Sequence, residues 1–363
     1  MVNIDTLLRI MFEKGASDLH LTVGAPPMLR IDGEMVASEF EKLRPDECQH
    51  VIYSILTDEQ KEKFERENEL DLSFGVEGIG RVRMNVYKQR GAVGAALRRI
   101  PMHILSFEEL GLPPAVQEIA KFPKGLVLVT GPTGSGKSTT LASMIDWINS
   151  HKAGHIITIE DPIEFIHTHK SCIVNQREVG TDTRKFSDAL KYVLRQDPDV
   201  ILVGEMRDLE TIEAALTIAE TGHMVYGTLH TPDAVQAINR MIDVFPAHQQ
   251  SQVRAQISFV LQAVVCQQLL PKSYSSGRAL CAEILITNAA IRNLIREEKI
   301  HQIYSIMQTG SEYGMRTMNQ SLAELYSKQL VTYNEIFART TDPKDLQRLV
   351  QGGGGGGGKS SAY

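Results

Sequence analysis

The stretch Gly125-Leu-Val-Leu-Val-Thr-Gly131-Pro-Thr-Gly-Ser-Gly-Lys137-Ser138-Thr139 is the most informative part of the chain. Its run of aliphatic residues predicts a buried parallel strand, and residues 131–138 then match the phosphate-loop pattern G-x-x-x-x-G-K-[ST]. A helical pattern follows at once. A phosphate-binding loop requires this order of strand, loop and helix. The alternative, a glycine-rich turn that binds nothing, does not account for the full match in this context.

Each residue type in the loop suits phosphate binding. The glycines permit backbone conformations that a Cβ disfavours, so successive N–H groups can point at phosphate oxygens. In sites of this class the lysine neutralises the β- and γ-phosphates of ATP, and the hydroxyl after it holds Mg²⁺. We therefore predict that the nucleotide is bound by Gly131, Pro132, Thr133, Gly134, Ser135, Gly136, Lys137, Ser138 and Thr139, with Lys137 also catalytic and Ser138 a Mg²⁺ ligand.

Composition indicates an ordinary globular protein. Of the 363 residues, 42% are hydrophobic and 23% charged, and no window approaches 18 uninterrupted apolar residues. We therefore expect no transmembrane segment and, since the first residues lack signal-peptide features, a cytoplasmic location. The net charge of −6 argues against a general nucleic-acid binder. The four cysteines are far apart in mostly apolar surroundings, which predicts core residues instead of disulfide or zinc partners.

Four regions follow from the patterns along the chain. Residues 1–100 mix short helices with alternating strands and predict a small α+β domain with an antiparallel sheet, and residues 101–112 predict a linker. In residues 113–350 buried strands alternate with helices, so we expect an α/β domain with a parallel sheet. Beyond residue 232 the pattern is largely helical, with one late strand at 278–286. The glycine-rich residues 351–363 predict a flexible tail.

Two strands in the second domain end in acids. The run Val200-Ile-Leu-Val-Gly-Glu205 has the form of a Walker B strand, and an acid there reaches Mg²⁺ directly or through water. We assign Glu205 to this role. The run Ile157-Thr-Ile-Glu160-Asp-Pro-Ile-Glu164 delivers three carboxylates. Glu164 is the one we assign to orienting the attacking water, and a solvated loop acid is the alternative.

A histidine lies at the end of the next predicted strand. The run Thr221-Gly-His223-Met-Val-Tyr-Gly-Thr-Leu-His230-Thr231 places one histidine before this strand and one after it. His230 is interpreted as a sensor of the γ-phosphate. A hydrogen-bonded structural histidine is the alternative, and it would be preferred if the other motifs were missing.

With these motifs placed, the chain resembles the secretion-ATPase superfamily, and within it the ATPases that retract type IV pili. The resemblance spans about residues 4–342. It is carried by residues 131–139, 157–164, 200–208, 221–231 and, as the most diagnostic run, 290–297.

This resemblance implies a PAS-like domain for residues 1–100 and a RecA-like ATPase domain with a helical C-terminal part for residues 113–350. It also implies a homohexamer that uses ATP and Mg²⁺ and docks peripherally on a platform protein of the pilus machinery at the inner membrane. In such a ring, Arg81 and Arg83 share one strand face and are candidate arginine fingers for a neighbouring subunit. The alternative is that they only cover the sheet.

The same motifs also occur in proteins with functions other than pilus retraction. Pilus-extension and type II secretion ATPases of the superfamily commonly carry a tetracysteine zinc module, and this sequence contains no C-x-x-C, which favours retraction. A RecA-like nucleic-acid translocase would share the phosphate loop, but the acidic charge and the lack of an aromatic and basic strand-binding stretch count against it. A subunit that binds ATP without hydrolysing it is a further alternative.

The run at residues 290–297 is expected to form an amphipathic helix that couples hydrolysis to work. Ile291, Leu294 and Ile295 share one face and should pack inward. Arg292 and Arg296 lie four residues apart and are expected to form a basic edge that docks to an acidic partner surface.

The phosphate-loop match predicts that Lys137→Ala abolishes ATP turnover without unfolding the chain. The γ-phosphate charge loses its neutralising partner, whereas a loop lysine contributes little to a core. Steady-state phosphate release and thermal melting, measured on the same preparation, test both halves. Wild-type turnover by this variant would remove Lys137 from the mechanism.

Overall fold

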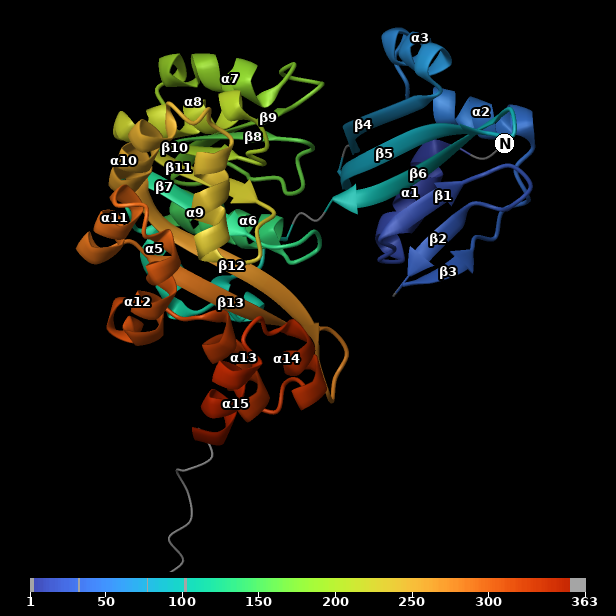
Figure 1. The fold of residues 1–363 in the computed structure, drawn as a ribbon. Helices are drawn as coiled ribbons and strands as arrows, with labels where there is room; N and C mark the ends of the chain where they lie inside the picture. Colours follow the sequence, from blue (N-terminus) through green and yellow to red (C-terminus); the bar gives the residue numbers. More distant parts are fainter. Residues whose placement is uncertain (1–2, 32, 77, 101–102, 353–363) are drawn as a thin grey trace, which may run out of the picture. The chain divides into compact units, whose positions relative to one another are not determined.

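The structure, a computed structural model, describes residues 3–31, 33–76, 78–100 and 103–352. The chain forms two compact units (Figure 1). The first comprises Met1–His103 with the short segment Glu164–Ile166, and the second comprises Ile104–Ile163 and His167–Tyr363. The predicted tail lies outside the described residues from 353 onward, and residues 351 and 352 complete the last helix.

The first unit is an antiparallel sheet packed against helices. Its six strands lie in the order β3-β2-β1-β6-β5-β4. Alternating residues such as Val82, Met84 and Val86 are buried, which is the pattern expected of a sheet with one face on the core. Its elements are α1 (Ile4–Glu13), β1 (Asp18–Leu21), β2 (Met28–Ile31), β3 (Glu34–Ala37), α2 (Pro45–Tyr53), α3 (Asp58–Glu67), β4 (Glu69–Val76), β5 (Gly80–Gln89) and β6 (Ala92–Ile100).

The second unit is built on a seven-stranded sheet in the order β13-β12-β7-β11-β10-β8-β9. Neighbouring strands are parallel except for β13, which pairs with β12 in an antiparallel hairpin. The strands are β7 (Gly125–Thr130), β8 (Gly154–Glu160), β9 (Cys172–Glu178), β10 (Val200–Val203), β11 (Met224–Leu229), β12 (Leu261–Pro271) and β13 (Arg278–Ile286). The sequence prediction of a largely helical region beyond residue 232 was wrong for β12, because a short apolar run does not distinguish strand from helix.

Helices cover both faces of this sheet. Alternate residues of β7 face opposite layers, so Leu126 and Leu128 pack with α8, α9 and α10, whereas Val127 and Val129 pack with α5 and α6. The helices are α4 (Phe107–Leu110), α5 (Pro114–Ala120), α6 (Lys137–His151), α7 (Phe186–Val193), α8 (Leu209–Glu220), α9 (Ala234–Asp243), α10 (Gln250–Val260), α11 (Ala289–Arg296) and α12 (Ile303–Thr309), then α13 (Met318–Ser327), α14 (Tyr333–Arg339) and α15 (Pro343–Gly352).

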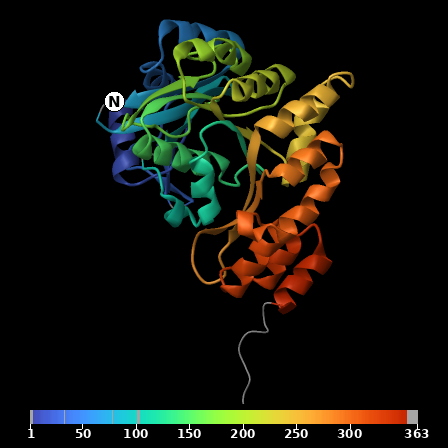
Figure 2. The same ribbon diagram turned by 90° about the vertical axis from the view of Figure 1, so that its left-hand side faces the viewer.

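The last three helices form a separate small core on the β12–β13 hairpin. Leu270 and Cys281 of the hairpin pack with Leu322, Ile336 and Leu346 of α13, α14 and α15. Figures 1 and 2 both show these helices gathered at one end of the hairpin. All four cysteines are buried and unpaired with one another, as predicted. Within the described residues, no helix is both long and apolar enough to cross a bilayer.

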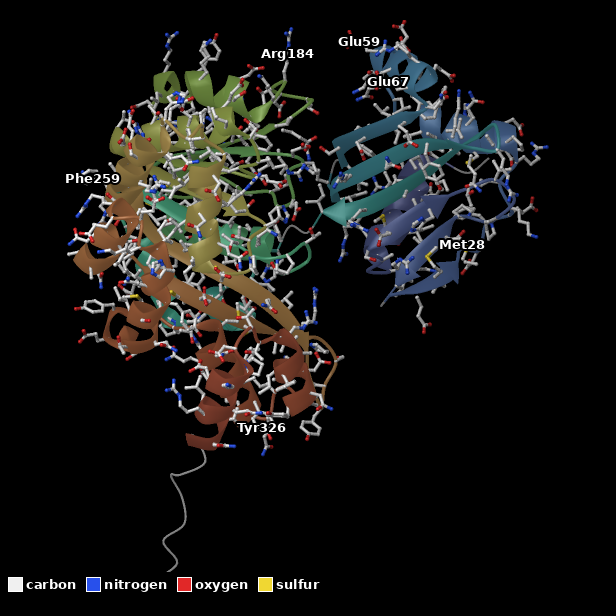
Figure 3. The ribbon with its side chains drawn as sticks, viewed as in Figure 1. Met28, Glu59, Glu67, Arg184, Phe259 and Tyr326 are labelled. Atoms are coloured by element: carbon white, nitrogen blue, oxygen red, sulfur yellow. The ribbon has the colours of Figure 1, made fainter. Side chains whose placement is uncertain are left out.

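The predicted basic edge of α11 differs from the structure at one arginine. Ile291 and Ile295 are buried as expected. The Nη1 atom of Arg292, however, donates to the carbonyl oxygens of Ser258 at 2.6 Å and Phe259 at 2.8 Å, at the C-terminal end of α10. Arg296 is exposed, and its guanidinium lies 5.8 Å from the ring centre of Phe259, which is 66% exposed (Figure 3). The last carbonyl groups of a helix have no partners within the helix and attract a cation. The Arg292 side chain therefore points towards the end of α10 and not into solvent.

This geometry predicts different effects for the two arginines of α11. Arg292→Ala removes charged hydrogen bonds from the end of α10 and should lower the free energy of unfolding by roughly 1–3 kcal/mol. Arg296→Ala is the matched control on the same helix and should change it by less than about 0.5 kcal/mol. Chemical denaturation of both variants measures the difference, and equal stabilities would contradict the capping role of Arg292.

Candidate nucleotide site

The phosphate loop joins the end of β7 to the start of α6 and depends on glycine. Gly131, Gly134 and Gly136 have φ values of 137°, 78° and 89°, in the region that residues with a Cβ avoid. A Cβ at Gly131 would also lie 2.3 Å from the backbone carbonyl oxygen of Gln267 on β12. The loop is therefore pressed against the neighbouring strand, and only glycine fits at its first position.

The predicted phosphate-binding residues lie together in this loop. The Nζ atom of Lys137 donates to the carbonyl oxygens of Gly131 at 2.8 Å and Pro132 at 3.1 Å, so it spans the loop from the first residue of α6. Ser138 and Thr139 follow in the first turn and are partly exposed, whereas Ser135 is buried. The N-terminus of a 15-residue helix thus faces the loop with its unsatisfied N–H groups.

A buried glutamine beneath the loop was missed by the sequence reasoning. Gln267 is 1% exposed, and its Nε2 donates to Oγ1 of Thr140 in α6 at 2.9 Å. Next to it, Oγ1 of Thr130 donates to Sγ of Cys266 at 3.0 Å. These contacts hold β12 to both ends of the phosphate loop. The available signal was polar residues inside the apolar run at 261–271, but that run was not recognised as a strand.

Glu205 and His230 meet at the same edge of the sheet as the loop. Leu229 pairs with Thr130, so the residues that follow them, His230 and the loop, leave neighbouring parallel strands together. The Nε2 atom of His230 lies 2.9 Å from Oε1 of Glu205, which also bonds Nε of Arg207. The Walker B acid and the predicted phosphate sensor are therefore in direct contact.

Glu160 is a second acid at this edge, and we had not assigned it a role. It ends β8, beside β10, and a Cβ on Gly204 would lie 3.1 Å from its Cα. Its Oε1 accepts hydrogen bonds from Oγ1 of Thr158 at 2.6 Å and from Nε2 of Gln176 at 3.3 Å. Glu160 is thus held rigidly next to the residue that precedes Glu205.

Three predicted catalytic residues belong to the first unit. Glu164 is exposed and lies in the segment that groups with that unit. Arg81 donates from Nη2 to Oγ of Ser73 at 2.6 Å, and Arg83 lies 3.9 Å from a carboxylate oxygen of Asp71. The two arginines share one face of β5, as predicted, because the intervening Val82 is buried on the other. The catalytic roles of these three residues stay predictions.

The fold and this cluster define a P-loop ATPase domain, in which a phosphate loop, the predicted Walker B acid Glu205 and the predicted sensor His230 share one edge of a parallel sheet. A family model described as "Type II/IV secretion system protein" matches residues 2–338. The chain belongs to this family.

Relatives and solved structures agree with this assignment. The chain is 51% identical over 331 residues to the type IV pilus retraction ATPase PilT of Pseudomonas aeruginosa, covering 91% of this chain and 96% of that protein. It is 49% identical over 305 residues to a twitching motility protein of Neisseria gonorrhoeae, covering 84% and 82%. A crystal structure of the pilus retraction motor PilT with bound ADP is similar with a TM-score of 0.90 and 53% identity, covering 96% of this chain and all of that one.

These similarities confirm three predictions made from the sequence. They are the secretion-ATPase family, the α/β fold class with a parallel sheet, and an ATPase of the pilus-retraction type. They also support a nucleotide as the ligand of the site. The PAS-like character of residues 1–100 stays a prediction.

Glu160, Glu164 and Glu205 are three candidate acids, and replacing each with glutamine should distinguish their roles. Glu164→Gln should keep nucleotide affinity and lower the turnover number by about 100-fold or more, because the amide keeps the shape and loses the charge that orients water. Glu205→Gln should instead raise the Mg²⁺ concentration needed for activity. Phosphate release across a Mg²⁺ titration, together with nucleotide affinity, distinguishes these outcomes.

Glu160→Gln is the matched comparison, since Glu160 lies four residues before Glu164 in the same run. If this variant loses turnover and Glu164→Gln does not, the water-orienting role belongs to Glu160. Normal turnover by Glu205→Gln at low Mg²⁺ would contradict the assignment of the metal ligand.

Proposed function

We propose that the chain is a homohexameric motor that hydrolyses Mg·ATP to retract type IV pili. The observation that carries this proposal is the contact between Glu205 and His230 beside the phosphate loop, in a chain 51% identical to a retraction ATPase over 91% of its length. The hexamer, the metal and the membrane partner are parts of the proposal that the family relationship supports.

The residues at the site fit ATP with Mg²⁺. The contacts of Glu205 with Arg207 and His230 both use Oε1, and we assign the second oxygen, Oε2, to the metal together with the hydroxyl of Ser138. The loop packs against β12 at Gly131 and leads into the N-terminus of α6, whose first N–H groups lack partners within the helix. Bound Mg²⁺ would neutralise charge on the β- and γ-phosphates.

The chain's own residues account for the remaining steps of the proposal. Lys137 exchanges the carbonyl oxygens of the loop for phosphate oxygens, since both are acceptors for the same ammonium group. Glu164 orients the attacking water. His230 responds to the γ-phosphate through its contact with Glu205. Arg81 and Arg83 of a neighbouring subunit act as arginine fingers, so that hydrolysis depends on ring assembly.

We further propose the setting in which this motor works. Residues 1–100 form a PAS-like domain and residues 113–350 a RecA-like ATPase domain. Of the linker predicted at residues 101–112, the part from Ile104 onward groups with the second unit and carries α4. The protein is cytoplasmic and reaches the inner membrane peripherally through the platform protein of the pilus machinery. Its load is a protein filament and not a nucleic acid, consistent with its net charge of −6.

Deleting the gene in its host bacterium tests the direction of the work. A retraction motor predicts cells with excess surface pili that no longer twitch, whereas an extension or secretion ATPase predicts bald or secretion-defective cells. Pilus counts by electron microscopy and twitching zones are the measurements. Complementation with the wild-type gene should restore both, and the Lys137→Ala gene should restore neither. Bald cells would overturn the retraction assignment and leave the ATPase assignment intact.

A further inference from the structure

A buried carboxylate outside the nucleotide cluster joins two helices of the second unit. Glu283 lies in the middle of β13 and is 2% exposed. Its Oε1 accepts the backbone N–H of Ala234 at 2.9 Å, and its Oε2 accepts the backbone N–H of Met318 at 3.2 Å. Each donor is the first residue of a helix, α9 and α13 respectively. One side chain therefore binds the N-termini of two helices.

Physical chemistry favours this arrangement. The first N–H groups of a helix have no partner within the helix, and the helix dipole makes its N-terminus attractive to negative charge. The side chains that cap the two helices accept from a different N–H, since Asp233 accepts from Gln236 and Thr317 accepts from Gln320. Glu283 thus satisfies a further first-turn donor of each helix. A charged acceptor in a buried site holds both helix ends in fixed positions.

The α9 side of this link leads directly to the nucleotide cluster. His230, which contacts Glu205, is four residues before Ala234, and Asp233 caps the helix between them. Only a short backbone segment therefore separates His230 from the N–H group that Glu283 binds.

The α13 side leads to the C-terminal helices. Next to Met318, the Nδ2 atom of Asn319 donates to the carbonyl oxygen of Asp342 and to Oδ2 of Asp345, both at 3.0 Å. Asp345 belongs to α15, and the hydroxyl of Thr340 donates back to Asn319 at 2.7 Å. Movement of the α13 terminus is thus passed to the helices packed on the hairpin.

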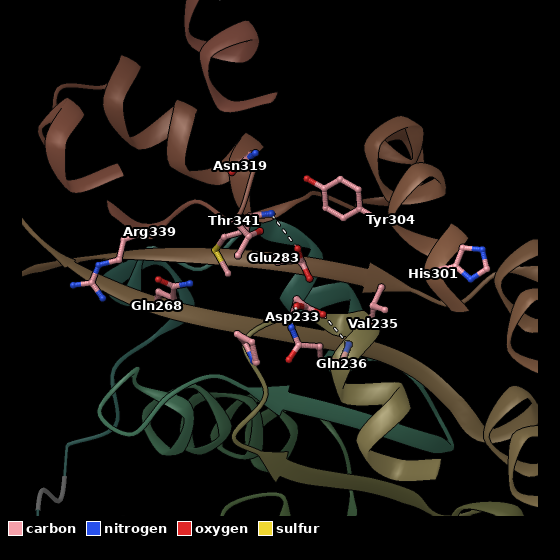
Figure 4. A pocket seen from close by; sticks show the side chains of 12 residues that line it. Asp233, Val235, Gln236, Gln268, Glu283, His301, Tyr304, Asn319, Arg339 and Thr341 are labelled. Carbon is pink, nitrogen blue, oxygen red and sulfur yellow. Dashed lines mark hydrogen bonds between the residues drawn. The ribbon is translucent and has the colours of Figure 1, made fainter. Parts of the chain in front are cut away.

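The two helix ends also border a cavity of about 300 Å³ (Figure 4). Asp233, the residue before α9, lines it together with Glu283 of β13 and Asn319 of α13, so a hollow lies where the three elements meet. Empty volume between elements permits small relative shifts that a close-packed core resists. The carboxylate bridge is therefore placed where α9 and α13 can move together.

We propose that Glu283 is a positioning residue that couples the state of the nucleotide cluster to α13 and, through it, to the C-terminal helices. This inference rests on nucleotide binding at the site described above and is independent of the load that the motor moves. It assigns Glu283 to transmission and not to chemistry, because its contacts are backbone groups of two helices.

Burial affects the charge on which this link depends. Desolvation raises the pKa of Glu283 to about 7, opposed by its two backbone hydrogen bonds. A protonated carboxyl has only one good acceptor oxygen, so coupling should weaken as the pH falls through about 7. The ionisable groups near Glu283 are Asp233 just before α9, Cys266 on β12, Cys281 on β13, and His301, Tyr304 and Arg339.

Hydrogen exchange on the full chain, with Mg·ADP and with Mg²⁺ plus a non-hydrolysable ATP analogue, tests the proposal. In the wild type, the analogue, which carries a γ-phosphate, should slow exchange relative to Mg·ADP both in residues 234–243 and in residues 318–327. In Glu283→Gln, which keeps the size but replaces one acceptor oxygen with an NH₂ group, the response of residues 318–327 should fall at least ~fivefold. The affinity for the ATP analogue should change by less than about twofold.

Two further variants keep the test decisive if Glu283→Gln unfolds. Ala234→Pro removes one donor from Glu283 at a helix position where proline is tolerated, after a residue whose extended backbone suits it, and it should give the same loss. Ser321→Ala is the matched control, because Ser321 binds Ala282 of β13 and lies outside the bridge. It should leave the nucleotide response of residues 318–327 unchanged.

The pH dependence provides a readout that a purely structural role would not move. At pH 6, the nucleotide response of residues 318–327 in the wild type should be as small as it is in Glu283→Gln. In Glu283→Gln, this response should be the same at pH 6 and pH 8. A full nucleotide response of residues 318–327 in Glu283→Gln, or none in the wild type when residues 234–243 do respond, would overturn the proposal. Absence of any nucleotide response in the wild type would count against the nucleotide site itself.

Discussion

The close contact between the phosphate loop and strand β12 is the constraint on which the second unit depends. The carbonyl oxygen of Gln267 leaves no room for a Cβ at Gly131, and the Gln267 side chain holds Thr140 at the start of α6. The loop therefore has a rigid strand on one side and a helix N-terminus on the other. Phosphate binding needs N–H groups that are fixed before the ligand arrives, and this packing restrains the loop and helix that carry them.

The parallel strands bring the other residues of the candidate site to the phosphate loop. Because β7, β11 and β10 run in the same direction, the residues after each strand emerge at one edge, and the register of Thr130 with Leu229 sets His230 beside the loop. The two faces of the sheet are filled by different helices, so the site is supported from both sides. Short contacts such as that of His230 with Glu205 then follow from topology and not from local sequence.

The sequence was informative where a feature is local. The phosphate loop, the burial of the β7 and β10 runs and the shared face of Arg81 and Arg83 all depend on neighbouring residues and periodicity. Features that depend on distant segments could not be predicted. Arg292 looked like a surface cation because the α10 carbonyls that bind it lie more than thirty residues away, and Glu160 gained its position only when β8 paired with β10.

The antiparallel hairpin of β12 and β13 connects the phosphate loop with helices outside the nucleotide site. On β12, Gln267 supports the phosphate loop, while on the facing strand Glu283 pairs in register with Cys266, the residue before Gln267. The same hairpin thus carries the residue that orders the loop and the residue that joins α9 to α13. Backbone hydrogen bonds between the two strands therefore connect the residue that supports the phosphate loop with the residue that binds the N-termini of α9 and α13.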